Sequence, residues 1–255
     1  MKRKIKFVDA HSHAYEFGSK ICNYRDNILI LCVSDDFKSS QLTLKLYKKY
    51  KCIIPALGVH PWSLDEVSID DINRVIQLIE ENLDIIKVVG EVGLDKRFKP
   101  QIYNVQVKVF EKFLTIAKEY NLALNLHAAG AWREVFEFLS KFKVENAIFH
   151  WYTGPINLIE EIENSGYYIS INAAAKIQPK HRNLIKYVDM DHILTETDSP
   201  YKYRGLNLMP ELVADAVNII AEEKGLNMEN VKKVIWRNFL SMLSNVGINY
   251  NTYIK

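Results

Sequence analysis

Short apolar runs alternate with amphipathic stretches along this chain. Eight such runs can be counted, and most are rich in Val, Ile and Leu without a clean alternation of polar and apolar positions. Continuous apolar sequence of this length is typical of strands buried on both faces of a parallel sheet. The eight predicted strands cover residues 5–10, 28–33, 52–59, 85–89, 122–126, 147–149, 167–171 and 192–196.

The stretches between these runs have the periodicity of helices. In two of them, apolar residues recur every three or four positions and therefore share one helix face. These residues are Ile69, Ile72, Ile76, Ile79 and Leu83 in one stretch and Val105, Val109, Phe113, Ile116 and Tyr120 in a second, over about 101–120. Ser68 stands three residues before Asp71 as a plausible capping pair for the first. Further helices are predicted at about 41–49, 131–142, 155–164, 179–187, 210–223 and 228–244.

Eightfold repetition of strand and helix defines an α/β fold, either a closed parallel barrel or an open doubly wound sheet. The count of eight favours a single (β/α)8 TIM barrel, and 255 residues is close to the usual length of that fold. Length alone would also allow two small domains, but no repeat, low-complexity segment or linker divides the chain. We therefore expect one domain over residues 1–255.

Composition indicates the cellular compartment but does not distinguish between classes of function. A net charge of +2 and a pI of about 8.2 argue neither for nor against nucleic acid or membrane as a partner. Three cysteines without paired spacing (Cys22, Cys32 and Cys52) indicate a reducing compartment. Lys2-Arg3-Lys4 precedes an apolar run of only six residues, and no run approaches the roughly 20 that span a bilayer. We expect a cytoplasmic protein without a membrane segment.

Histidines gather where predicted strands end. His11 and His13 follow the first strand, and because side chains two apart in extended backbone point the same way, both imidazoles can face one ion. His60, His127 and His150 end the third, fifth and sixth strands. Each of them alone is explained as well or better by a structural hydrogen bond, but barrel active sites collect at these strand ends, and the concentration there predicts a metal site. The two remaining histidines, His181 and His192, are interpreted as structural.

Two carboxylates complete the cluster. Glu91 ends the fourth run, and a carboxylate buried among imidazoles is costly unless a cation compensates it. We interpret it as the bridge between two divalent ions, which Zn²⁺, Mn²⁺ or Mg²⁺ could supply. Asp198 ends the eighth run and could ligate one ion and take the proton from a bridging water. Two such ions lower the pKa of a shared water and draw charge off a phosphoryl or acyl oxygen, which is hydrolysis without a nucleophilic side chain.

The motifs together resemble those of the TatD family of metal-dependent hydrolases, in the amidohydrolase superfamily. They are His-x-His after strand one, Gly-x-His-Pro, Gly-Glu-x-Gly-Leu-Asp, one His after strands five and six, and Glu-Thr-Asp-Ser-Pro after strand eight. The resemblance covers nearly the whole chain and implies a barrel with a two-metal site. It assigns one ion to His11, His13, Glu91 and Asp198, and the other to Glu91, His127 and His150. It also implies that Asp198 is the general base and that the activity is that of an exonuclease-like DNase.

Departures from the family pattern bear on the substrate. Where the family has His-x-Arg-Asp-Ala, residues 127–131 read His-Ala-Ala-Gly-Ala, and where it has Arg-Asn-Glu-Pro, residues 206–210 read Leu-Asn-Leu-Met-Pro. Arginine is a natural phosphate contact, so these losses weigh against a polynucleotide. Arg97 and Arg204 could compensate for them, and Lys96 and Lys202 are less favoured. His60 could also contact substrate. The simpler interpretation of each is an ordinary polar residue of a loop or strand end.

Aromatic side chains stand near the same strand ends. Trp62, Trp151, Tyr201 and Tyr203 could stack on nucleobases, or could simply be rim aromatics.

Three functions remain to be weighed. The leading one is metal-dependent hydrolysis of phosphodiester bonds, with DNA as partner and Asp198 and Glu91 as catalytic residues. The second keeps the metal centre but cleaves a different ester or an amide, such as an aminoacyl ester. The third, a non-catalytic nucleic-acid-binding barrel, predicts the loss of metal ligands, and all six are present. Nothing in the sequence indicates an obligate protein partner.

Overall fold

The computed structural model describes residues 5–24 and 27–248, and its centre is a sheet of eight parallel strands. The strands are hydrogen-bonded in sequence order from β1 to β8. Their apolar side chains are almost all buried, because helices cover the outside of the sheet. The strands are β1 (Phe7–Ser12), β2 (Ile28–Cys32), β3 (Ile53–Leu57), β4 (Val88–Gly93), β5 (Ala123–His127), β6 (Ala147–Phe149), β7 (Tyr168–Asn172) and β8 (Ile193–Glu196).

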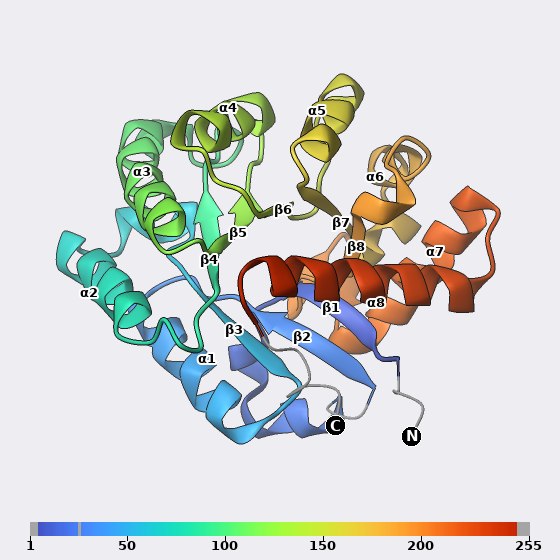
Figure 1. Cartoon of the computed structure of the whole chain (residues 1–255), viewed down its shortest axis with the longest axis horizontal. Coiled ribbons are helices and arrows are strands. Elements are labelled where there is room, and N and C mark those ends of the chain that lie inside the picture. The colour runs from blue at the N-terminus through green and yellow to red at the C-terminus, as the bar shows by residue number, and fades with distance from the viewer. Residues whose placement is uncertain (1–4, 25–26, 249–255) are drawn as a thin grey trace.

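The sheet closes where β8 returns to the side of β1. The hydroxyl of Thr195 donates to the carbonyl oxygen of Val8 at 2.6 Å, and the backbone N–H of Asp198 donates to the carbonyl of His11 at 2.9 Å. Figure 1 shows the helices arranged around this ring of strands. The fold is the predicted (β/α)8 barrel and not an open doubly wound sheet.

Helices follow the strands along the chain. Ser68 caps α2 by accepting a hydrogen bond from the backbone N–H of Asp71, as predicted. Pro179 is the first residue of α6. The helices are α1 (Phe37–Lys49), α2 (Ile69–Glu80), α3 (Tyr103–Glu119), α4 (Trp132–Phe142), α5 (Ile159–Asn164), α6 (Pro179–Leu184), α7 (Val213–Lys224) and α8 (Met228–Asn245). Among the described residues, no helix combines the length and the apolar character that a membrane span requires.

The strands at the site end later than the apolar pattern indicated. β1 continues to Ser12, β4 to Gly93 and β5 to His127, because these polar residues still have partners in neighbouring strands: Ser12 pairs with Cys32, and Gly93 with His127. Two residues of the predicted apolar helix faces are exposed rather than buried. Ile69 is 72% exposed and Val105 is 45% exposed, while α3 buries Gln106 and Phe110.

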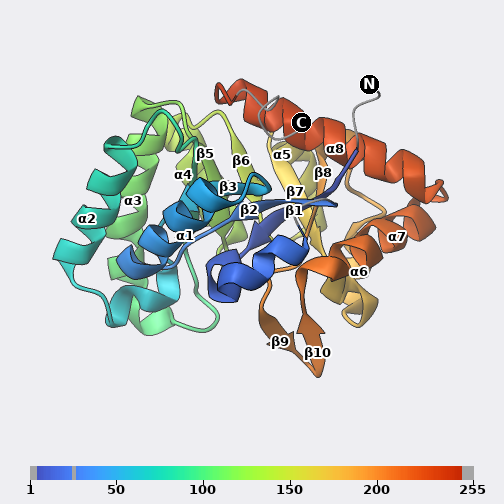
Figure 2. The same ribbon diagram turned by 90° about the horizontal axis from the view of Figure 1, so that it is seen from below.

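Short elements absent from the predicted pattern shape the open end of the barrel. Residues Ala14–Asn23 (η1), after β1, form two stretches of 3-10 helix that meet at a kink at Gly18, where φ is 53°. Beyond β8, β9 (Tyr201–Tyr203) and β10 (Leu206–Leu208) pair as an antiparallel hairpin. Arg204 and Gly205 both have positive φ, of 48° and 89°, as a two-residue turn matched to strand twist requires. Figure 2 shows the hairpin projecting from the barrel as a separate arm.

Two of the three cysteines, Cys32 and Cys52, are buried, in keeping with their place in apolar runs. The basic segment Lys2-Arg3-Lys4 lies outside the described residues.

Candidate metal centre

The carboxyl ends of the eight parallel strands meet at one end of the barrel. Three of the predicted site residues lie near the ends of strands: His11 in β1, Glu91 in β4 and His127 in β5. The other three lie in loops that follow strands: His60, His150 and Asp198. Five of these residues and His13 line one pocket with a cavity volume of about 640 Å³. His11 is fully buried and does not line it. Arg97 and Arg204 lie at the rim of the same pocket.

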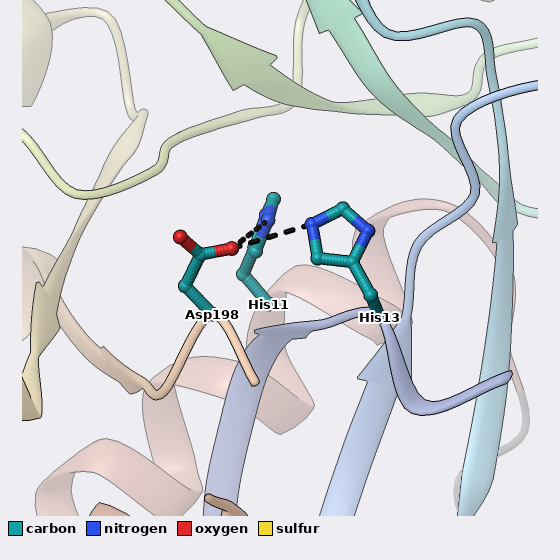
Figure 3. A group of neighbouring side chains, drawn as sticks. All are labelled: His11, His13 and Asp198. Carbon is teal, nitrogen blue, oxygen red and sulfur yellow. Dashed lines mark ion pairs between the residues drawn. The ribbon is translucent and has the colours of Figure 1, made fainter. Parts of the chain in front are cut away.

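Four donor atoms form a first cluster that matches the size of a metal site. Nε2 of His11 lies 3.3 Å from Oε2 of Glu91 and 3.4 Å from Oδ1 of Asp198. Nε2 of His13 lies 3.5 Å and 3.3 Å from the same two oxygens. Figure 3 shows both imidazoles directed at one carboxylate oxygen of Asp198. Donors held about 2.1 Å from a tetrahedral ion stand about 3.4 Å apart, so these four atoms fit a divalent cation.

A second cluster forms on the other oxygen of the same carboxylate. Oε1 of Glu91 lies 2.9 Å from Nδ1 of His127 and 3.2 Å from Nε2 of His150. Glu91 thus turns one oxygen to each cluster, which is the geometry required of a bridging ligand. His60 approaches Oε1 as well, with its Nε2 3.2 Å away, so His60, Glu91 and His127 also form a group that could hold an ion.

Hydrogen bonds that His11 and His127 donate to neighbouring residues set the tautomers of these two rings. Nδ1 of His11 donates to Oδ1 of Asn125 at 2.6 Å, and Asn125 is oriented by donating its own amide to the carbonyl of Ala10. Nε2 of His127 donates to Asp95 at 2.8 Å. Each bond leaves the lone pair of the opposite ring nitrogen directed at a cluster. A carboxylate or carbonyl behind a histidine is the usual support of a metal ligand.

Carboxylates also lie behind His13 and His150, although neither ring makes a hydrogen bond to them. Nδ1 of His13 lies 3.2 Å from Oδ2 of Asp35, and the same oxygen accepts a hydrogen bond of 2.5 Å from the hydroxyl of Tyr15. Nδ1 of His150 lies 3.4 Å from Glu196. Four buried atoms of the described residues have no hydrogen-bond partner: Nδ1 of His13, Nδ1 of His150, Oδ1 of Asp35 and, facing the first cluster, Nε2 of His11. Since an unpaired buried donor or acceptor is costly, the orphaned Nε2 of His11 is further support for a cation at the first cluster.

The carboxylates of both clusters are held in their ionised form. Burial would raise the pKa of Glu91, but the positive charges that His60, His11 and His150 carry when protonated hold it well below its usual range. Burial likewise opposes ionisation of Asp198, but His11 and His13 in their protonated forms outweigh it and lower its pKa. An ionised carboxylate is what both metal ligation and general-base chemistry require.

His60 differs from the other four histidines. Its Nδ1 accepts a hydrogen bond from the backbone N–H of Trp62 at 3.0 Å, so the neutral ring carries its proton on Nε2. That nitrogen faces the second cluster, 3.2 Å from Glu91 and 3.3 Å from His127. A protonated Nε2 is suited to donate to an oxygen of a bound molecule rather than to ligate an ion.

Four supporting residues did not emerge as site residues from the sequence: Asp35, Asp95, Asn125 and Glu196. Asp95 and Glu196 belong to the two most specific motifs, Gly-Glu-x-Gly-Leu-Asp and Glu-Thr-Asp-Ser-Pro, and could have been suspected on that ground. Asp35 follows β2 and Asn125 lies inside β5, and neither has a sequence signal. The two histidines expected to be structural lie away from the clusters: His181 bonds to Tyr152 and Asn172, and His192 to Tyr167.

The chain is similar to known proteins over nearly its whole length. The model of a family described as TatD related DNase matches residues 8–244. A metal-dependent hydrolase of Methanocaldococcus jannaschii, itself uncharacterized, is 33% identical over 247 residues, covering 92% of this chain and 96% of that protein. The human deoxyribonuclease TATDN3 is 25% identical over 261 residues, covering 93% and 94% of the two chains. In fold, a crystal structure of the TatD homologue YJJV from Escherichia coli superposes with a TM-score of 0.83 at 21% identity, over 93% of this chain and 98% of that one.

Proposed function

The chain belongs to the TatD family of metal-dependent hydrolases, and we propose that it cleaves phosphodiester bonds of DNA at strand ends. The observation that carries the proposal is the position of Glu91, with one carboxylate oxygen in each of two donor clusters. A pair of divalent ions would occupy them, from among Zn²⁺, Mn²⁺ and Mg²⁺. The named relatives that are deoxyribonucleases support the choice of substrate.

When bound, two divalent cations would lower the pKa of a water and draw charge off a phosphoryl oxygen. The chain's own residues would do the rest. Asp198, held ionised by His11 and His13, would accept the proton that the attacking water loses. Its φ of 55° and the bond from its N–H to His11 turn its side chain to the pocket.

His60 would contribute a proton donor on the opposite side of the pocket. Its Nε2 proton points to the second cluster, where a non-bridging or leaving oxygen of the substrate would lie. Trp62 fixes this tautomer through its backbone, so the role depends on the turn that begins at His60-Pro61. Arg97 and Arg204, both exposed at the rim, would contact phosphate groups.

A different ester or an amide is the alternative substrate. The pocket wall after β5 consists of Ala128 and Ala129, where the family pattern carries an arginine, so this wall offers no cation to a phosphate. That observation favours a less charged substrate than DNA, such as an aminoacyl ester, on the same metal centre.

One experiment tests both. End-labelled single-stranded oligonucleotide is incubated with the protein and Mg²⁺ or Mn²⁺, beside the Asp198→Asn variant and the Asp71→Asn variant. Asp71 lies in the first turn of α2 and does not line the pocket, so its variant controls for handling and for loss of one charge. We expect a ladder with wild type and Asp71→Asn and none with Asp198→Asn. Equal cleavage by all three proteins would identify a contaminating nuclease. If the metal-loaded protein cleaves no oligonucleotide, the proposed substrate becomes the different ester or the amide.

A further inference from the structure

Two groups of aromatic and cationic side chains flank the metal centre from opposite sides. One group, here called the β4 arm, consists of Trp62, Arg97 and Phe98. The other, the β8 arm, consists of Trp151, Tyr201, Tyr203 and Arg204. All seven line the pocket. β4 and β8 lie four places apart in a closed ring of eight strands and are therefore opposite one another.

The two arginines are exceptional among those that the structure describes. Arg74, Arg133, Arg182 and Arg237 each pair with a carboxylate. Arg97 and Arg204 have no carboxylate partner among the described residues, although both are exposed. Each instead lies over an aromatic ring of its own arm, with the guanidinium carbon 5.2 Å from the ring centre of Phe98 and 5.3 Å from that of Tyr203. Their charges therefore remain available to a ligand.

The β4 arm is built onto a single carboxylate. Asp95 accepts the indole N–H of Trp62 at 2.5 Å and the backbone N–H groups of Arg97 and Phe98 at 2.7 and 2.6 Å. The rings of Trp62 and Phe98 meet edge to face with their centres 5.5 Å apart. Phe98 remains 57% exposed, so part of its ring is open to a ligand in the pocket.

The β8 arm is held by other means. Nε1 of Trp151 donates to Gln178 at 2.8 Å, and its ring meets those of Tyr203 and Tyr201 edge to face at 5.1 and 6.1 Å. The backbone of Trp151 has a φ of 41°, a conformation that a bulky residue adopts only where its surroundings enforce it. Tyr201 is 43% exposed beside it. These contacts fix the Trp151 ring against the β9–β10 hairpin.

Each arm combines what a nucleotide offers to a protein. An exposed aromatic face stacks on a base, and an unpaired guanidinium binds a phosphate. We propose that the arms are two nucleotide subsites, one on each side of the scissile bond, so that the preferred substrate places a nucleotide in both. The inference rests on the proposed phosphodiesterase function and extends it from the bond that is cut to the groups on either side.

Substrates that fill neither, one or both subsites test the proposal. Bis(p-nitrophenyl) phosphate carries no nucleotide, the p-nitrophenyl esters of thymidine 5′- and 3′-phosphate carry one, on opposite sides of the phosphorus, and the dinucleotide TpT carries two. The variants are Phe98→Ala for the β4 arm and Tyr201→Ala for the β8 arm, because these substrates carry no phosphate beyond the one that is cut and therefore report on the aromatic half of each subsite. Tyr187→Ala is the control, since Tyr187 is exposed and does not line the pocket.

We expect each arm variant to lower kcat/KM about tenfold or more on one thymidine ester and to leave kcat/KM on the other ester unchanged. The ester that is affected should differ between the two variants. Both arm variants should lose activity on TpT, and the control should lose none. Binding of TpT to the metal-free protein, followed by tryptophan fluorescence in EDTA, should weaken in both arm variants without any contribution from catalysis.

Two other outcomes would overturn the proposal in different ways. If bis(p-nitrophenyl) phosphate is cleaved and neither arm variant discriminates between the thymidine esters, the subsites are refuted and the phosphodiesterase stands. If no phosphodiester is cleaved by the metal-loaded protein and TpT does not bind, the proposed function fails together with the subsites.

Discussion

Asp95 accepts the Nε2 proton of His127 at 2.8 Å through the same oxygen, Oδ2, that accepts the indole N–H of Trp62. A single carboxylate oxygen therefore orients a donor of the second cluster and an aromatic wall of the pocket. Burial opposes ionisation of Asp95. The hydrogen bond from His127 and the other hydrogen bonds to its carboxylate outweigh burial and lower its pKa to about 2. The lowered pKa favours the ionised carboxylate, which can accept from His127 and Trp62 together.

We predict that Asp95→Asn weakens metal binding at the second cluster by about 10- to 100-fold, the usual effect of removing the partner of a metal-bound histidine. Asparagine cannot accept from His127 and Trp62 and also from the N–H groups of Arg97 and Phe98 without presenting its own N–H₂ to a donor. Calorimetric titration of the metal-free protein with Zn²⁺ measures the change. Asp71→Asn is the matched control, and equal affinities for the two variants would contradict the prediction.

Glu91→Gln should leave at most one tightly bound ion per chain and reduce turnover by about 10² or more, since loss of one electrostatic contact at a reacting centre typically costs that much. The amide keeps one oxygen and replaces the other with a donor, so it can serve only one of the two clusters. Metal content by mass spectrometry and kcat on the same preparation decide the matter. Wild-type values of both would show that Glu91 does not bridge.

Gly90→Ala should destabilise the fold and disturb the site at once. A Cβ at this position would lie 2.7 Å from Cβ of Asn125, closer than side-chain carbons approach one another. Relief requires β4 and β5 to separate, which displaces the residue that orients His11. We expect a loss of about 1–3 kcal/mol in the free energy of unfolding.

The control for that variant is Gly18→Ala. No atom lies within 4 Å of the Cβ that it would add, so only its positive φ of 53° opposes the substitution, at about 1–2 kcal/mol. Both free energies come from urea unfolding of the metal-free proteins. Metal affinity is then measured on the folded fraction, and only Gly90→Ala should lower it.

His181 should make stability depend on pH below neutrality. Burial is the main cause that lowers the pKa of its imidazole to about 4 from 6.5, since the ring is enclosed between the carbonyl of Tyr152 and the N–H of Asn172. Because the folded pKa is depressed, the neutral ring is favoured in the folded chain. Its contribution is complete above pH 6.5 and is lost as pH falls from 6.5 to 4, by up to about 3 kcal/mol.

The variant His181→Gln carries both a donor and an acceptor but does not titrate. Unfolding of wild type and variant in EDTA at pH 7.5 and pH 5 separates this residue from the metal ligands, which titrate in both proteins. Wild type should lose more stability than the variant between the two pH values. Equal losses would show that His181 is not the titrating group.

The sequence alone determined the architecture and the order of the donors. Eight continuous apolar runs separated by helical periodicity lead to a parallel barrel, because such runs can be buried only when helices cover them. Parallel strands end at one edge, so polar residues that follow them must converge. His11, Glu91, His127 and Asp198 could therefore be assigned to one site although 187 positions separate the first from the last.

Tertiary structure alone decided which atoms face which cluster. Asn125 reads as an ordinary strand residue, and Asp35 as a helix-flanking one, until folding brings them behind His11 and His13. The tautomer of His60 follows from one backbone N–H, which no spacing in the sequence reveals. The β9–β10 hairpin owes its position to two residues of positive φ and to the packing of Trp151. Periodicity reports which side of an element is buried, whereas hydrogen-bond partners depend on contacts between residues far apart in the chain.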